Sequence, residues 1–596
     1  MRLKLCLCLA LLSPVQAFAQ TALSIGDLSF TAINTTDPDS FGIVLWKSVD
    51  SNTVIKFTDN SFNSDAYTIG STATGGIGGN EGFMVLTTTS TLPAGTMIRI
   101  ENAGGGVSAV TLSSGAATSS GALSGLSTAG DQIFAYQGSG TGSNISGGTA
   151  TETFSGTILS GVDMRSGGWL TGTTASTNAS NIPKELNDAG YFGSIDISSS
   201  DDDARYAGSR TGLTAAAYRA AVGNTVNWNH DTTNTVVSTT AFVINASADL
   251  FWDRNGGLSG FGGDGTWDTT SNRFATSDDG TWFRWVDSDV NNAHTAVFGT
   301  AAGSVTIASP VTASGLKFQV SGYAIQGSTI NALGTTFGID VGASNTATIS
   351  SVVAGAVGTT ISKTGAGSLT LAGANTYSGL TSVSQGTLKL LNTGSISGSI
   401  KVGTSTTFDV TSFASGFTIA TGRTLSGNGT VNGKTIIQGT VSPGNSIGSL
   451  SVGAEDWAGG GQYTWEVNSI PSGGTAGTNW DFLTIGGILN VTASPGSPFT
   501  IKLVSLDGGG APGTLTGVTT NQQYTWTIAT ASSVTNFDPS KFTFNTDDFT
   551  TTAAGAWSIQ NSGGNVVLVY STPEPSAALL FGLPLLFTRR RSRIRG

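Results

Sequence analysis

Residues 365–392 read GAGSLTLAGANTYSGLTSVSQGTLKLLN, and their pattern is the strongest indication of the fold in the sequence. Leu369 with Leu371, and Leu388 with Leu390, alternate with polar residues in two successive short runs. Alternation places both leucines of a run on the same side of a β-strand. The spacing of the two runs suits a coil of about 20 residues, which would return that side to the interior at every turn, so that each coil buries what its neighbour exposes. We therefore expect a right-handed parallel β-solenoid.

The same stretch resembles the autotransporter-associated β-strand repeat. The segment is about 363–391, and the residues that carry the resemblance are Gly365, Gly367, Leu369, Leu371, Gly373, Asn375, Tyr377, Gly379 and Thr381. A second stretch, GTVSPGNSIGSLSV at 439–452, resembles the motif that often follows this repeat. We expect the solenoid to occupy 301–455.

The regions on either side of the solenoid also predict β-structure. Residues 20–245 contain short alternating runs bounded by Gly, Asn and Asp, which predicts a β-sandwich-like domain with one helix at 215–222. GDLSFTAIN, VIKFTDN and GDQIFAYQG in this region resemble bacterial lamin-tail-like domains, which implies a surface module and nothing catalytic. Residues 246–300 are expected to form a Trp-rich cap or linker. Residues 456–570 form a C-terminal β region that either ends the solenoid or folds as a small sandwich. The predicted fold class is all-β.

The segment 1–19 has the pattern of a secretory signal peptide. A positive start is followed by a short apolar run at 5–12 and by a small-x-small pattern in which Ala17 and Ala19 are the small residues, so we expect cleavage between Ala19 and Gln20. Both cysteines, Cys6 and Cys8, lie in this peptide, so the secreted chain would contain neither disulfides nor thiolate sites.

Charge excludes one class of partner. Without the signal peptide's Arg2 and Lys4 and the five arginines of the tail, 19 basic residues remain against 37 acidic ones, a balance of −18. Nucleic acids reward basic patches, so no nucleic-acid partner is expected.

The chain ends in an apolar run at 577–587, interrupted by Pro584 and followed by arginines. As a helix this run would reach about 16 Å, whereas the core of a bilayer is about 30 Å thick. The tail resembles the PEP-CTERM sorting signal, which implies recognition and removal by an exosortase-type membrane protease, transient membrane insertion, and delivery to the cell surface or matrix. A plain membrane anchor is the alternative. The signal residues are Pro573, Glu574, Pro575, Arg589, Arg590 and Arg591.

Motifs of catalysis and metal binding are weak. Gly444–Gly448 matches Gly-x-Ser-x-Gly around Ser446, but no βα alternation surrounds it, so we expect a turn of the solenoid. Asp287–Asn291 opens like an EF-hand loop, yet Asn292 and Phe298 replace the required Gly and Glu. The acidic run 201–203 is expected to be solvated surface. His230 and His294 have no neighbouring histidine in the sequence, so a zinc site is not expected. We predict no cofactor, no metal and no enzymatic activity.

Four closely spaced tryptophans leave two interpretations open: a cap on the solenoid, or a surface on which sugars stack. They are Trp252, Trp267, Trp282 and Trp285. The sequence has no regular Thr-x-Thr pattern, which argues against ice binding. It therefore predicts a secreted structural or adhesive surface protein that contacts exopolysaccharide or another matrix polymer. The alternatives are a carbohydrate-binding protein and, less favoured, a hydrolase carried on a solenoid.

Overall fold

The computed structural model describes residues 20–574, apart from residues 60, 63–76, 79–81, 103–106, 124, 129–130, 140–154, 171–179, 190–193, 198–200, 202, 233–235, 255–260 and 277–280. The predicted signal peptide and the apolar tail therefore lie outside the described residues. Strands account for 52% of the chain and helices for 5%, which confirms the all-β prediction. The chain divides into two compact units, one comprising residues up to 361 with 366–378, the other 362–365 with the residues from 379 on.

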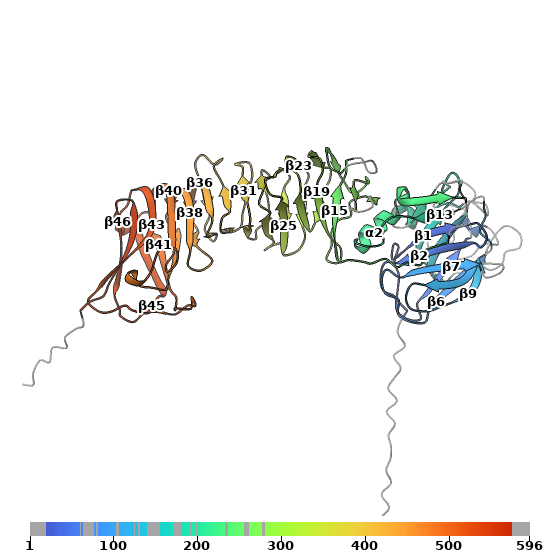
Figure 1. Ribbon diagram of the computed structural model, residues 1–596, viewed down its shortest axis with the longest axis horizontal. Helices are drawn as coiled ribbons and strands as arrows, with labels where there is room; N and C mark the ends of the chain where they lie inside the picture. The colour runs from blue at the N-terminus through green and yellow to red at the C-terminus, as the bar shows by residue number, and fades with distance from the viewer. Residues whose placement is uncertain are drawn as a thin grey trace, which may run out of the picture. The chain divides into compact units, whose positions relative to one another are not determined.

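The first unit begins with a domain built on one large, mostly antiparallel sheet (Figure 1). The strand order is β12-β11-β10-β3-β6-β9-β8-β7-β2-β1-β13-β14. Every residue of β1 and β2 is buried, because the sheet curls until β1 also contacts β11. The strands are β1 (Leu28–Asn34), β2 (Ser40–Leu45), β3 (Val54–Thr58), β6 (Gly82–Thr88), β7 (Met97–Asn102), β8 (Val107–Leu112), β9 (Ala117–Leu123), β10 (Gln132–Ser139), β11 (Ser155–Asp163), β12 (Ser194–Asp196), β13 (Asp203–Tyr206) and β14 (Trp228–Asp231), with β4 (Ser61–Phe62) and β5 (Ile77–Gly78) paired separately.

The predicted helix is α2 (Ala215–Val222), followed by the short 3₁₀ turn η2 (Thr225–Asn227). Its N-cap is Thr214, whose side chain accepts a hydrogen bond from Ala217 N. Tyr218 of α2 stacks on Trp46 and meets Phe242 edge-on, which fastens the helix to the domain core. A second helix, α1 (Lys184–Ala189), was not predicted, and its Leu186 is buried in a cluster with Phe62, Phe134, Tyr136, Ile158 and Ile182.

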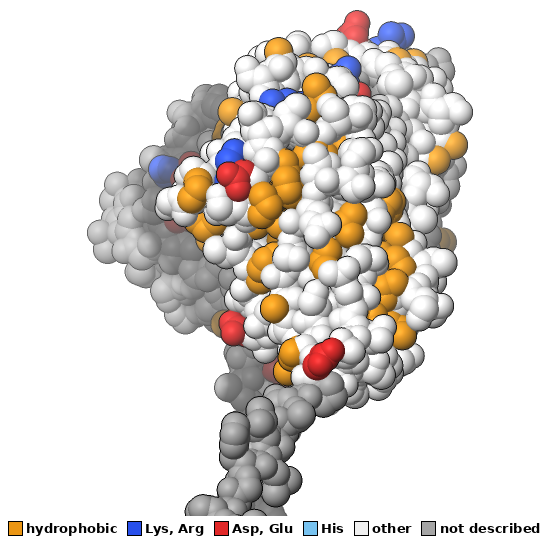
Figure 2. Space-filling model, turned by 90° about the vertical axis from the view of Figure 1, so that its left-hand side faces the viewer, with side chains coloured by type: hydrophobic (Ala, Val, Ile, Leu, Met, Phe, Trp, Pro, Cys, Tyr) orange, Lys and Arg blue, Asp and Glu red, His pale blue; other side chains and the backbone are white. Residues whose placement is uncertain are grey.

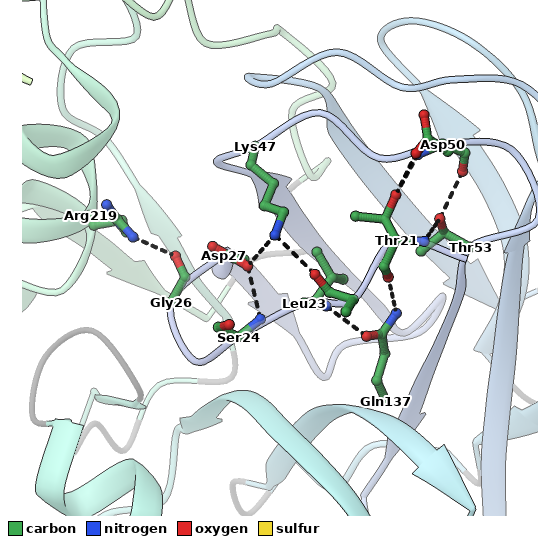
Figure 3. Close-up of polar contacts among 11 residues, drawn as sticks. Thr21, Leu23, Ser24, Gly26, Asp27, Lys47, Asp50, Thr53, Gln137 and Arg219 are labelled. Carbon is green, nitrogen blue, oxygen red and sulfur yellow. Dashed lines mark hydrogen bonds and ion pairs between the residues drawn. The ribbon is translucent and has the colours of Figure 1, made fainter. Parts of the chain in front are cut away.

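The first described residues are tied into this domain (Figure 3). Gln137 of β10 accepts from Leu23 N at 2.8 Å and donates to Thr21 O at 2.9 Å. Lys47 donates to Asp27 at 3.1 Å, and Arg219 of α2 donates to Gly26 O. If the signal peptide is removed as predicted, the N-terminus of the remaining chain would lie directly before this hydrogen-bonded segment.

Parallel pairing begins within the first unit, after residue 246. β15 pairs in parallel with β19 and β19 with β22, so the Trp-rich segment supplies strands to the same sheet as the first coils. One sheet of this unit holds β15 (Ser247–Trp252), β17 (Phe274–Ala275), β18 (Trp282–Phe283), β19 (Ala293–Phe298), β22 (Gly315–Phe318) and β25 (Thr336–Val341). A second holds β16 (Gly265–Trp267), β20 (Ser304–Ile307), β23 (Tyr323–Gly327), β26 (Thr346–Ile349) and β29 (Ser368–Leu371), and a third β21 (Val311–Ala313), β24 (Ile330–Ala332) and β27 (Val353–Gly355).

The second unit also consists mostly of short strands that pair in parallel, and β28 (Thr360–Thr364) lies at its boundary with the first unit. One of its sheets holds β30 (Thr381–Val383), β32 (Ile400–Val402), β35 (Thr424–Gly427), β37 (Thr440–Pro443), β39 (Gln462–Val467), β41 (Phe499–Ser505) and β44 (Phe542–Asp548). The other holds β31 (Thr387–Leu390), β33 (Thr407–Asp409), β36 (Thr430–Ile437), β38 (Ser449–Trp457), β40 (Phe482–Val491), β43 (Gln523–Thr535), β47 (Asn565–Ser571) and β46 (Ala556–Ser562), and β34 (Phe417–Ile419) pairs with β36. Short elements are β42 (Thr514–Leu515), β45 (Thr550–Thr551), η3 (Pro471–Gly473) and η4 (Pro539–Lys541).

Coil length changes along the second unit. The step from the start of β31 to the start of β33 equals the expected coil, whereas the step from β40 to β43 is about twice as long. The stack ends in an antiparallel hairpin, because β47 pairs antiparallel with both β43 and β46. The end that carries β46 in Figure 1 faces the viewer in Figure 2, where hydrophobic side chains outnumber charged ones.

Parallel pairing thus extends on both sides of 301–455, from β15·β19 to β41·β44, and 456–570 ends the solenoid. The domain limits themselves stay predictions. Within the described part of the chain, no helix is long and apolar enough to cross a membrane.

Candidate functional site

The repeat residues lie inside the coil. Leu369, Leu371 and Tyr377 are fully buried, and Leu369 lies beside Ala347 of the neighbouring strand in the parallel ladder. Two of the glycines stand where coils approach closely. A Cβ on Gly367 would lie 2.3 Å from Gly342 O, and one on Gly373 would lie 2.3 Å from Ser351 O. Gly365 has a φ of +71°, which favours glycine.

Polar residues of the repeat satisfy the backbone of the coil. The side chain of Asn375, 3% exposed, accepts a hydrogen bond from Val353 N at 2.9 Å. Thr381 is also buried. Lys363, which the sequence did not single out, is fully buried, and its Nζ donates to the carbonyls of Thr364, Gly365 and Gln385. The buried residues of the repeat therefore shape the coil, and its outward residues remain partly exposed.

The outward side of the coils in the second unit carries a regular line of hydroxyl groups. The register pairs one hydroxyl residue of each strand with one of the next, in the order Thr387, Thr407, Thr430, Ser451, Thr484 and Thr530. We call these six residues the hydroxyl row. Neighbouring strands lie about 4.8 Å apart, so the row extends over about 24 Å. All six residues are partly or fully exposed.

The side chains of the hydroxyl row have no hydrogen bonds to other groups among the described residues of the chain. The comparable row on the other sheet differs. It runs through Thr424, Thr440, Gln462, Thr500 and Thr543, so an amide interrupts it, and Thr500 hydrogen-bonds Thr543 at 3.2 Å. Of these two rows, the hydroxyl row alone presents an unbroken series of free donors and acceptors.

The hydroxyl row was missed in the sequence because it has no fixed period. Thr387 and Thr407 stand one coil apart, but Thr484 and Thr530 are more than twice as far from each other. A usable signal is the hydroxyl residue directly before a buried aliphatic or aromatic one, as in Thr387-Leu388, Thr407-Phe408 and Thr430-Val431.

Ser446 lies in a bend between β37 and β38, and no helix follows it. Asp481 is buried beside this bend and accepts from Gly448 N at 2.8 Å and from Glu466 N at 3.0 Å. Burial raises the pKa of Asp481 well above its ordinary value, and burial likewise raises the pKa of Glu466, against a lowering hydrogen bond from Ser446. This geometry is that of a fastened turn, as expected, rather than a nucleophile elbow.

The histidines are held in strands. The imidazole of His294, in β19, is buried between Thr214 and the carbonyl of Val286, and burial lowers its pKa. His230 lies in β14.

The aspartates of the EF-hand-like stretch 287–291 accept hydrogen bonds from backbone N–H groups and from side chains. Asp289 accepts from Asn291 N and Asn292 N, and Asp287 binds Trp285 Nε1 and Thr312 N. Among the residues that the structure describes, no three or more His, Cys, Asp and Glu side chains are placed to hold a metal ion.

The expectation of a solvated acidic run at 201–203 is wrong for Asp203, which is 1% exposed because β13 pairs on both sides, with β1 and β14. Asp202 lies outside the described residues. Two further buried carboxyls, Asp131 and Asp163, have pKa values raised to about 7, mainly by burial. Asp131 accepts backbone hydrogen bonds from Ser127 and Gln132, so these acids hold loops in place.

The tryptophan cluster divides into two kinds. Trp252, Trp267 and Trp285 are buried in the core at the start of the parallel sheets, where they pack on Phe274. This favours the capping interpretation for these three, since a buried ring cannot stack on a sugar. Trp282 is partly exposed.

Comparison with known proteins bears on the coil. Residues 361–390 match the passenger-associated-transport-repeat family. The chain is also 42% identical over 150 residues to a protein named Adhesin BmaC autotransporter from Brucella suis biovar 1 (strain 1330). That alignment covers 24% of this chain and 4% of the relative, so the chain spans only a small part of its length.

The passenger-associated repeat confirms the resemblance drawn from residues 363–391. It covers Leu369, Leu371, Asn375 and Tyr377, which are the buried members of the coil described above. The resemblances to PEP-CTERM tails and to lamin-tail-like domains stay predictions. The sorting residues Pro573 and Glu574 follow β47 directly, whereas Pro575 and the arginines lie outside the described residues.

Proposed function

We propose that the protein is a secreted, non-enzymatic surface protein whose solenoid adheres to a matrix polymer, such as an exopolysaccharide, along the hydroxyl row. The observation that carries this proposal is the unbroken series of six outward hydroxyls, one per strand, that make no hydrogen bonds within the described protein.

A linear polymer with regularly spaced hydroxyls is a fitting partner for such a row. Each hydrogen bond contributes only about 1 kcal/mol net, so a single hydroxyl of the row would bind the polymer weakly. Several hydroxyls on one rigid scaffold bind together more strongly, because the first hydrogen bond to the polymer brings its next hydroxyls close to the remaining residues of the row. The acidic balance of the processed chain, −18 without the signal peptide and the tail arginines, further favours a neutral polymer over an anionic one.

The comparisons support this class of function. The relative from Brucella suis is named as an adhesin, and residues 361–390 match the passenger-associated-transport-repeat family. We extend adhesion to this chain because its repeat residues build a coil whose outer surface remains available.

Export and sorting belong to the same proposal. The signal-peptide pattern would direct secretion, and an exosortase-type protease would process the tail at Pro573–Pro575 after transient membrane insertion. The mature protein would then lie on the cell surface or in the matrix. The fastened turn at Ser446 supports a protein without hydrolytic activity.

The test is adhesion of the purified protein to surfaces coated with matrix polysaccharide. The triple variant Thr407→Val, Thr430→Val and Thr484→Val removes three hydroxyls and keeps β-branched side chains that suit a strand. We expect the affinity for the polysaccharide to fall roughly 100-fold, the effect of losing ~3 kcal/mol from three hydroxyls. The matched control is Thr424→Val, Thr440→Val and Thr500→Val on the other sheet. Equal adhesion by both triple variants would contradict the proposal.

A further inference from the structure

A pocket of about 200 Å³ opens in the first unit beside the one partly exposed tryptophan of the cluster. The described residues that line it come from three places: the segment after β13, the turn η2 with the start of β14, and the start of β18. They are Ala207, Gly208, Val226, Asn227, Asn229, Thr281 and Trp282.

The walls of the pocket are fixed by hydrogen bonds. Asn227 accepts from Trp282 N at 2.9 Å and donates to Trp282 O at 2.6 Å, and Asn224 donates to the same carbonyl at 2.8 Å. Thr281 accepts from Ser209 N at 3.0 Å. The backbone of Trp282 is therefore held by two asparagines, which fixes this wall of the pocket.

Gly208 lines the pocket at a closely packed position. A Cβ on Gly208 would lie 2.5 Å from Tyr206 Oη and 2.8 Å from Thr281 Oγ1, so a larger residue has no room there. At the rim, Asn229 is exposed and Val226 is 64% exposed. The described lining is uncharged throughout and mixes one aromatic ring with amide, hydroxyl and apolar groups.

Partly exposed aromatic rings continue from the pocket. The ring of Phe261 lies 5.9 Å from that of Trp282, and Phe251 lies 5.8 Å from Phe261. Trp282, Phe261 and Phe251 are all partly exposed, whereas the other three tryptophans of the cluster are buried.

From this arrangement we propose that the pocket binds one neutral pyranose ring of a polysaccharide, with Trp282 as the stacking platform. An aromatic ring offers a face to the C–H groups of a sugar, while Asn229 supplies donors and an acceptor for its hydroxyls. Pockets for drug-sized ligands measure about 300–1,000 Å³, so this smaller one suits a single ring. Phe261 and Phe251 would contact the next units of the chain.

The absence of charge in the described lining sets the ligand class. A phosphate or an acidic sugar would be expected to meet Arg or Lys, because ionised acceptors are bound by charge-assisted hydrogen bonds. This site is separate from the hydroxyl row, which lies in the second unit, so either proposal can fail without the other.

The experiment is calorimetric titration of the full secreted chain with cellohexaose, laminarihexaose, mannohexaose and a galactan hexamer, and with a polygalacturonate fragment as the anionic probe. We expect at least one neutral probe to bind and the anionic probe to bind more weakly. Binding of none of the neutral probes, or preference for the anionic one, would overturn the proposal.

A pair of matched variants assigns the binding to the pocket. Val226→Arg places a long side chain across the rim without removing a buried contact, whereas Val290→Arg makes the same change at a valine that is 90% exposed and does not line the pocket. We expect Val226→Arg to weaken binding by about tenfold or more and Val290→Arg to bind as the unaltered protein does.

Trp282→Ala should also lose binding, while Trp557→Ala, at a partly exposed tryptophan of the second unit, should keep it. Circular dichroism would establish that each variant is folded. Unchanged binding by Val226→Arg would reject the pocket, whatever the tryptophan variants do.

Discussion

The Oγ1 atom of Thr214 lies 2.6 Å from Nε2 of His294, a residue far along the chain. Nδ1 of the same imidazole lies 2.8 Å from Val286 O, so it carries a proton and donates, and Nε2 accepts from the threonine hydroxyl. Thr214 also caps α2 by accepting from Ala217 N. One hydroxyl therefore joins the helix of the N-terminal domain to the parallel strand β19.

Thr214→Val should destabilise the first unit by ~2 kcal/mol, since it removes the helix cap and leaves Nε2 of a buried imidazole without a donor. Chemical denaturation followed by circular dichroism would measure the change. Thr214→Ser keeps the hydroxyl and should remain close to the unaltered protein. Equal stability of the Val and Ser variants would show that the contact contributes nothing.

Leu369→Asp should unfold the coil or cost about 4 kcal/mol, because it places a carboxylate at a fully buried position beside Ala347. Thr370→Asp, one residue along and partly exposed, is the control and should cost little. Thermal unfolding compares the two. A similar loss in both variants would contradict the inward placement of Leu369.

Asn375→Ala should cost about 2 kcal/mol, because the N–H of Val353 would lose its acceptor in a buried position. Thr376→Ala changes the next, exposed residue and serves as the control. Hydrogen exchange at Val353 gives a local readout, and faster exchange is expected only in the Asn375 variant.

The coil was predictable because its pattern is local. Leu369 and Leu371 alternate with polar residues within one strand. Each coil packs only against its neighbours, so the same alternation has to appear again about one coil later in the sequence. The helix at 215–222 was equally local, with alanines after a capping threonine. By contrast, α1 spans less than two helical turns, and Leu186 is buried through contacts with residues as distant as Phe62.

The candidate sites were harder to predict because exposure depends on distant residues. Four tryptophans look alike in the sequence, yet three are buried in the core, whereas Trp282 is partly exposed and lines the pocket described above. Asp203 follows two other aspartates, the pattern of a solvated run, and is nevertheless covered by strands on both sides. Loops of unequal length conceal the hydroxyl row, although the register aligns it.

Glu455→Gln should remove part of the pH dependence of the second unit. Glu455 is fully buried, accepts from Trp457 and Thr435, and has its pKa raised by burial to about 7 from 4.5. The folded state thus binds a proton more tightly than the unfolded one, so stability should increase as the pH falls from 8 towards 4.5, by about 3 kcal/mol from this group. In the Gln variant that increase should vanish, while Asp547→Asn, at an exposed carboxyl, should retain it.

Processing of the tail should leave a C-terminus at Glu574 or shortly after it. Thr572 N donates to Gln522 O, and Asn521 N donates to Pro573 O, so both residues are held by the folded unit and are poor substrates for a protease. Mass spectrometry of surface material would locate the terminus. Replacing Pro573 and Pro575 by Ala should leave full-length chains in the membrane. Intact tails on surface-exposed protein would instead indicate a plain anchor.

The antiparallel hairpin β46·β47 affects how readily a parallel β-solenoid could add further chains at its end. Parallel strands stacked at about 4.8 Å are also the arrangement of amyloid fibrils, in which an open end recruits further chains. At the C-terminal end of the second unit, β47 reverses the chain direction, and the outermost strand β46 presents exposed Ser558, Gln560 and Asn561. Short, polar and reversed edges disfavour templated growth. The sheet that carries the hydroxyl row therefore ends in an edge that does not favour the addition of a second chain, whereas the other sheet ends in β44, which is parallel to β41.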